Sequence, residues 1–108
     1  MSARLDSLHA LCGGPRDGAL LRVALANALI DEDANVDAIA ELRRALEFDP
    51  DYSAAWKQLG RLLAESGDAT AAIETYRSGI AAAQKRGDKQ AEKEMRVFLK
   101  RLEKPARS

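Results

Sequence analysis

The stretch from Trp56 to Asp68, WKQLGRLLAESGD, reads as a good helix with one exception, a glycine at its centre. Gly60 costs a helix roughly 1 kcal/mol relative to alanine. Trp56, Leu59, Gly60 and Leu63 follow the i, i+3, i+4, i+7 spacing of a single helical face. The glycine therefore lies on the apolar side. There it allows a second helix to approach closely, and we favour this interpretation over a flexible hinge.

A shift of the chain by 34 residues places the apolar stripes of one region on those of another. Ala26 then falls on Gly60, and Leu42 falls on Tyr76. The identical pairs are Leu25 with Leu59, Leu29 with Leu63, Ala38 with Ala72, Ile39 with Ile73 and Arg43 with Arg77. A fixed period of this length is typical of a helical repeat protein. Each unit is predicted to be a pair of antiparallel helices.

The pattern predicts an all-α chain of six helices, near residues 3–11, 18–31, 35–47, 52–66, 69–86 and 88–103. We expect a single domain over residues 1–108. It consists of an N-terminal helix with a Gly-Gly-Pro turn (1–18), a first repeat (19–52), a second repeat (53–86) and a C-terminal capping helix (87–104). Asn35, Asp68 and Asp88 are the expected N-caps, since Asn and Asp side chains accept from the free N–H groups of a first turn. No stretch alternates at a strand period, so no strand is expected.

These repeats resemble the tetratricopeptide repeat (TPR) family, whose signature runs W-x2-L-G-x2-Y, then A-x3-F, then P. The matching positions are Leu25, Ala26, Leu29, Ala38, Leu42 and Pro50 in the first repeat, and Trp56, Leu59, Gly60, Leu63, Ala72 and Tyr76 in the second. Arg22 replaces the Trp of the first repeat. Gln84 replaces the Pro of the second, so its last helix is expected to run on to Gly87. The resemblance implies a solenoid of antiparallel helix pairs with Trp56 in the core.

The resemblance also implies a concave groove, lined by the first helix of each repeat. The expected groove residues are Leu20, Val23, Asn27, Ile30, Lys57 and Arg61. Such a groove suits a peptide with an apolar side chain beside an acidic group or C-terminal carboxylate. The alternative is that Lys57 and Arg61 are solvated helix residues without a binding role. Relatives that clamp chaperone tails use a Lys and Asn pair; Asn27 matches the Asn but Val23 stands in the Lys place, so we predict no such clamp.

Charge divides the chain into two parts. Residues 1–84 carry 8 Lys and Arg against 13 Asp and Glu, whereas residues 85–108 carry 9 against 4. The cations of the second part lie along one face of the capping helix, at Lys89, Lys93, Arg96, Lys100, Lys104 and Arg107. A basic helix of this kind binds nucleic acid or anionic surfaces in some proteins and is simply solvated in others. Acidic residues interrupt the face and no aromatics are interleaved for base stacking, so nucleic acid is the less favoured partner.

Chemical groups for catalysis are few. His9 is the only histidine and Cys12 the only cysteine, so the chain holds no internal disulfide and no thiolate metal cage. No Gly-rich phosphate loop is present, and no segment approaches the roughly 20 apolar residues of a membrane span. We expect a cytoplasmic, non-catalytic protein-interaction module without cofactor or metal. Two other functions stay open: a small chaperone or assembly factor for one client, and binding of nucleic acid or an anionic surface through the basic C-terminal helix. Because two full repeats are fewer than the three or so that a repeat stack usually needs, either the flanking helices stabilise the fold or the protein self-associates.

Overall fold

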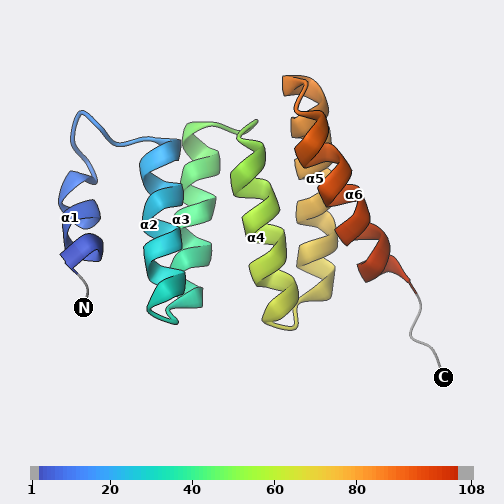
Figure 1. The fold of residues 1–108 in the computed structure, drawn as a ribbon, viewed down its shortest axis with the longest axis horizontal. Helices are drawn as coiled ribbons and strands as arrows, with labels where there is room; N and C mark the ends of the chain where they lie inside the picture. Colours follow the sequence, from blue (N-terminus) through green and yellow to red (C-terminus); the bar gives the residue numbers. More distant parts are fainter. Residues whose placement is uncertain (1–2, 105–108) are drawn as a thin grey trace.

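The computed structural model describes residues 3–104. Within them the chain forms six helices and no strand, which confirms the all-α prediction (Figure 1). Their bounds are α1 Ala3–Leu11, α2 Ala19–Asp31, α3 Asn35–Phe48, α4 Ser53–Glu65, α5 Ala69–Arg86 and α6 Lys89–Glu103. Each lies within a residue or two of its expected position. The division of these helices into two repeats and a capping helix stays a prediction.

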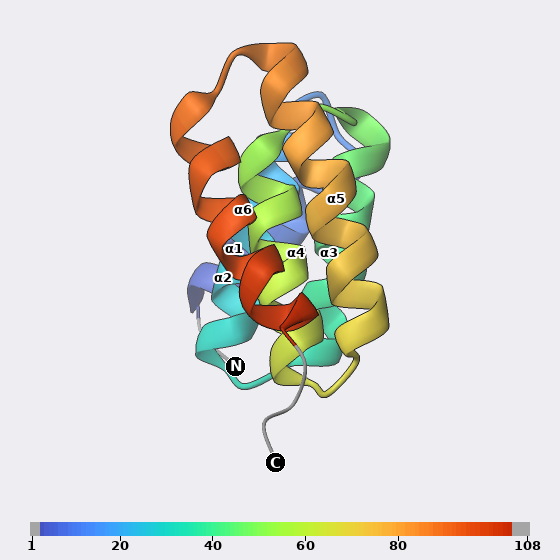
Figure 2. The ribbon, with the colours of Figure 1, turned by 90° about the vertical axis from the view of Figure 1, so that its right-hand side faces the viewer.

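The helices stand side by side along the long axis of the molecule (Figure 1). Consecutive helices pack as antiparallel neighbours, α2 against α3, α4 against α5 and α5 against α6, with further contacts of α3 with α4 and of α4 with α6. An end-on view separates two layers, one of α2, α4 and α6 and one of α3 and α5 (Figure 2). The capping helix α6 thus occupies the place that a first helix takes in a further repeat.

The helix ends follow local chemistry. The side chains of Asp68 and Asp88 each accept a hydrogen bond from a backbone N–H of the following first turn, at 3.1 Å in both cases. Gly67, after α4, adopts a φ of 90°, which glycine does at no steric cost. The predicted cap at Asn35 is wrong, because α3 begins at that residue and Ala34 takes the N-cap place without a side-chain bond.

The core comprises two clusters of buried residues, a larger one that extends from α1 to the start of α5 and a smaller one between α5 and α6. Leu25, Leu42, Leu62 and Met95 are its largest fully buried side chains. All of the repeat-signature residues are buried except Pro50 and Trp56. Trp56 was expected in the core, but it is half-buried at its edge. Its indole N–H donates to the carbonyl of Pro50 at 2.7 Å, a bond that holds the ring beside the chain turn before α4.

Arg22 takes the place that Trp56 has in the second repeat, and it is buried more deeply than Trp56, at 8% exposed. Its guanidinium donates to both carboxylate oxygens of Asp17, at 2.9 and 2.7 Å, and to Glu41 at 2.8 Å. Asp17 also accepts from the N–H of Gly13 at 2.8 Å. This network joins the turn after α1 to α2 and α3, so an ion-pair cluster replaces the aromatic ring of the signature.

The cluster makes stability depend on pH. The Arg22 side chain, assisted by the Gly13 N–H, holds the pKa of Asp17 well below its usual range. A carboxyl whose folded-state pKa is depressed stabilises the fold above the unfolded-state pKa, about 4, and this contribution is lost as the pH falls. We expect Asp17→Asn to unfold at lower urea than the parent at pH 7, with the difference shrinking at pH 3. Urea midpoints measured at both pH values test this; a difference that does not change with pH would contradict it.

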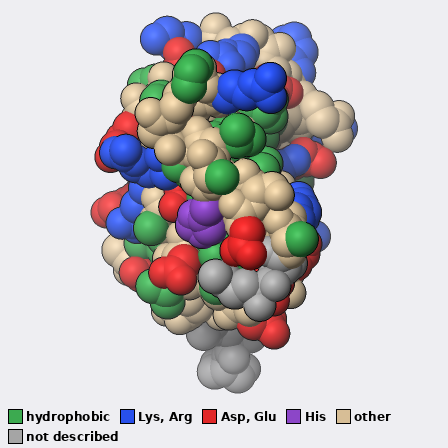
Figure 3. Space-filling model, turned by 90° about the vertical axis from the view of Figure 1, so that its left-hand side faces the viewer, with side chains coloured by type: hydrophobic (Ala, Val, Ile, Leu, Met, Phe, Trp, Pro, Cys, Tyr) green, Lys and Arg blue, Asp and Glu red, His purple; other side chains and the backbone are tan. Residues whose placement is uncertain are grey.

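The surface at the α1 end is mixed. Hydrophobic side chains lie scattered among acidic and basic ones around the single histidine of the chain (Figure 3). Leu11, at 37% exposed, is the one large apolar side chain of α1 that stands out. Across residues 3–104, no helix combines the length and the apolar character needed to cross a membrane.

Candidate functional site

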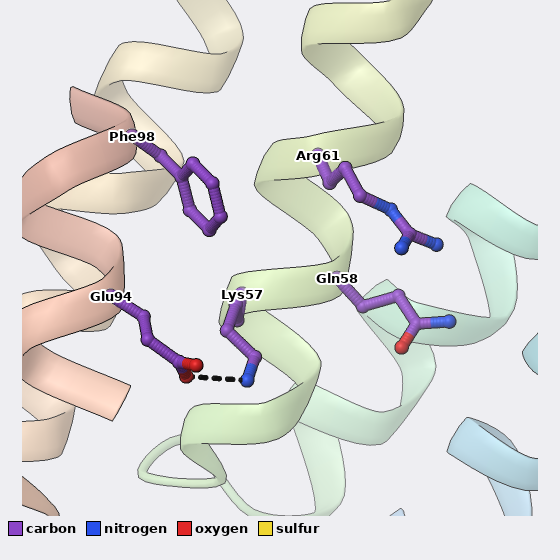
Figure 4. Close-up of a pocket in the computed structure, with 5 residues that line it drawn as sticks. All are labelled: Lys57, Gln58, Arg61, Glu94 and Phe98. Atoms are coloured by element: carbon purple, nitrogen blue, oxygen red, sulfur yellow. Dashed lines mark hydrogen bonds and ion pairs between the residues drawn. The ribbon is translucent and has the colours of Figure 1, made fainter. Parts of the chain in front are cut away.

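Three adjoining hollows surround Phe98, on the side of the molecule where α4 faces α6. The first, about 220 Å³, is lined by Lys57, Gln58, Arg61, Glu94 and Phe98 (Figure 4). The second, about 170 Å³, is lined by Arg61, Ala64, Glu65, Tyr76, Phe98, Arg101 and Leu102. The third, about 370 Å³, is lined by Gln90, Lys93, Glu94, Val97, Phe98 and Arg101. Phe98 is the one residue common to all three, so its ring is the centre of the surface.

The floor of the surface is aromatic. The rings of Phe98 and Tyr76 lie 5.8 Å apart between centroids, tilted by 32°. Tyr76 is 2% exposed, and this burial raises the pKa of its hydroxyl. Phe98 keeps part of its ring accessible. The phenylalanine therefore presents an apolar face to solvent that is backed by a buried ring.

Lys57 is engaged within the protein. Its ammonium lies 2.8 Å from Glu94, which links α4 to α6 (Figure 4). This hydrogen bond from Lys57 lowers the pKa of Glu94. Both side chains are more than a third exposed, so the pair contributes little to stability. Because the cation already has a carboxylate partner, Lys57 offers a ligand less charge than the sequence suggested.

Two arginines keep their charge available. Within the described residues 3–104, the one ion-pair contact of the Arg61 guanidinium is a long one to Glu65, at 3.9 Å, and both side chains are exposed. From α4 it extends away from Phe98, to the side where Gln58 lies (Figure 4). Arg101 of α6 stands over the Phe98 ring, 5.9 Å from its centroid. Among residues 3–104, Arg101 has no ion-pair partner.

The groove residues predicted on α2 differ in how far the structure exposes their side chains. Asn27 accepts a hydrogen bond from Gln58 of α4, so it lies on the same side as the hollows. Leu20 is 73% exposed, and Ile30 is half-buried. The prediction of Val23 as a groove contact is wrong, because this side chain is only 9% exposed. It belongs to the same buried cluster as Leu5 of α1, which packs on α2.

Sequence reasoning missed Phe98 and Arg101 as surface residues. In the sequence, Phe98 shares one apolar face of the capping helix with Ala91, Met95 and Leu102, and this spacing predicts a buried side chain. The spacing of apolar residues could have indicated this exposure, because Ala91 and Met95 of α6 correspond to Ala55 and Leu59 of α4, and all four are buried. This offset makes α6 a third first-layer helix, whose open side continues that of α4.

The other chemically notable side chains lie away from this surface or on its margin. His9 is exposed on α1, and Cys12 is half-buried, with its Sγ 3.7 Å from the carbonyl of Leu8. Of the predicted basic face, Lys89, Lys93, Arg96, Lys100 and Lys104 are exposed, and Arg107 lies outside the described residues. Arg96 is paired with Glu92 at 3.0 Å. The part of the chain that the structure describes has no cluster of His, Cys, Asp and Glu arranged to hold a metal.

Known proteins share both the sequence and the fold. A tetratricopeptide repeat family model matches residues 29–92. A TPR repeat-containing protein of Pseudomonas aeruginosa is 40% identical over 99 residues, which span 92% of this chain and 94% of that protein. A solution structure of a protein from Bordetella parapertussis, 44% identical, superposes with a TM-score of 0.78 over 94% of this chain and 89% of that one.

A tetratricopeptide repeat domain protein from Salinibacter ruber, also solved in solution, is 28% identical with a TM-score of 0.78. It covers 87% of this chain and 96% of its own. The family model, the curated relative and the solved structures thus agree with the repeat signature and with the two-layer helical stack. The chain belongs to the tetratricopeptide repeat family of helical protein-interaction modules.

Proposed function

We propose that this protein binds a peptide segment of a partner protein across the side formed by α2, α4 and α6. The observation that carries the proposal is the group around Phe98: a partly open aromatic ring with Arg101 over it and the weakly engaged Arg61 at the edge of the same hollow. Aromatic and arginine side chains dominate the energetics of protein interfaces. The proposed compartment is the cytoplasm, as expected from the sequence.

The side chains define the chemistry of the segment. The open ring of Phe98 favours an apolar side chain, and the two guanidinium groups favour a carboxylate near it. Gln58 and Asn27 supply amide groups at the α2 edge, which can pair with a peptide backbone. We assign Lys57 a structural role rather than a direct contact with the peptide, because its pair with Glu94 links α4 to α6 across the first hollow. The proposed ligand is an acidic segment with an apolar residue.

Selection from a random peptide library with the whole chain tests the proposal. We expect Arg61→Glu to weaken the selected peptides about tenfold or more, which corresponds to ~1.4 kcal/mol. The helical fold should persist, because exposed charges contribute little to stability. The matched control is Arg43→Glu, an exposed arginine of α3 in the other layer. Equal binding by the parent and the folded Arg61→Glu variant would place the binding site elsewhere.

A further inference from the structure

We infer that the second hollow, between α4, α5 and α6, is the anchor subsite that receives one apolar side chain of an acidic peptide. This inference rests on the proposed function and specifies its ligand. It assigns the anchor to Phe98 and its neighbours rather than to α2, where Val23 and Ile30 were expected to supply the apolar contact. The occupant is an aliphatic or aromatic side chain of the partner segment.

The size of the hollow limits its occupant. Its volume is about 170 Å³, below the range of ~300–1,000 Å³ typical of small-molecule and cofactor sites. Four of its lining side chains are apolar or aromatic: Ala64 of α4, Tyr76 of α5, and Phe98 and Leu102 of α6. A space of this size and lining suits a single apolar side chain and leaves the rest of a ligand outside.

The walls are prepared before binding. Tyr76 is buried behind Phe98, so the aromatic floor does not have to form when a ligand arrives. Ala64, Phe98 and Leu102 are only half-buried. Covering their accessible surface contributes about 25 cal/mol for each Å² removed from water. Preorganised apolar walls lower the ordering cost that weakens many peptide complexes.

The charges at the rim select what flanks the anchor. Arg61 and Arg101 line the hollow from α4 and α6, and Glu65 is the only acidic residue among the lining residues. The guanidinium of Arg101 already stands over Phe98, so a carboxylate close to the inserted side chain meets a cation without any helix having to move. A basic segment meets the same two cations and is disfavoured. This charge complementarity identifies the occupant as an acidic peptide.

The test is a parallel selection of random peptides displayed on phage against four purified proteins. Ala64→Leu fills the hollow from the α4 side and removes no core atom. Ala40→Leu adds the same atoms at an exposed position of α3 and is its matched control. Arg101→Glu reverses the charge at the rim on an exposed side chain. Circular dichroism confirms that each variant is folded before the selection.

We expect the parent and Ala40→Leu to enrich peptides with Leu, Ile or Phe beside Asp or Glu. Ala64→Leu should lose the apolar preference by about tenfold in affinity and keep the acidic one, and Arg101→Glu should do the reverse. Peptides that bind the parent and Ala64→Leu equally overturn the anchor while the proposed function stands. A parent that enriches no peptide overturns both. A parent that dimerises, with the dimer lost in Ala64→Leu, replaces the peptide by a second copy of the chain.

Discussion

Gly60→Leu should lower the free energy of unfolding by about 3 kcal/mol, the upper end of the usual cost of overpacking. A Cβ at this position would lie 2.6 Å from Cε1 and 2.7 Å from Cζ of Tyr76. That ring is buried and packed against Phe98, so any shift of the ring disturbs the packing between α5 and α6. Chemical denaturation of the parent, Gly60→Leu and Ala54→Leu, an exposed control on the same helix, measures the effect.

The first repeat shows how the same contact is built with other residues. Ala26 and Leu42 occupy the places of Gly60 and Tyr76, and both are fully buried. In the second repeat the leucine is replaced by the larger tyrosine, and the alanine that faces it loses its methyl group and becomes glycine. We expect Gly60→Ala with Tyr76→Leu to be more stable than the sum of the two single changes predicts, by roughly 0.5–3 kcal/mol. Additive effects, or an unchanged midpoint for Gly60→Leu, would contradict this account of the glycine.

Gly79→Leu should cost about 2–3 kcal/mol, because it wedges apart α5, α4 and α6 at once. A Cβ here would lie 2.6 Å from the Sδ of Met95 and 2.6 Å from the Cβ of Trp56. Met95 has a flexible side chain, but the Trp56 Cβ is fixed to the backbone of α4. The strain is relieved most easily by moving α6, since this helix closes the stack.

Amide hydrogen exchange distinguishes this local effect from general unfolding. In Gly79→Leu we expect protection to fall first in α6, with α2 and α3 less affected. Ser78→Leu changes the adjacent, exposed position of α5 and is the matched control. Because α6 carries Phe98 and Arg101, the variant should also lose any peptide that binds between α4 and α6. An equal loss of protection in every helix would contradict the local displacement of α6.

The sequence by itself determined the six helices, their pairing and the family. These features depend on the 34-residue period, on apolar positions spaced within single helices, and on caps such as Asp68 and Asp88. Even the length of α5 followed from one substitution, Gln84 in place of a proline. Such signals are local, because a helical face is written into residues three and four apart.

Only the tertiary structure decided which side chains meet on the surface. Val23 fits a groove on a helical wheel, yet it is buried in the core cluster that also contains Leu5 of α1. Lys57 has the position of a free cation, yet Glu94, 37 residues later, neutralises it. Phe98 lies three residues after the buried Met95 on α6, yet its ring is half-open, and Gly60 faces the large ring of Tyr76. Each outcome depends on how far one helix is rotated and shifted against another, and a one-dimensional pattern does not specify that packing.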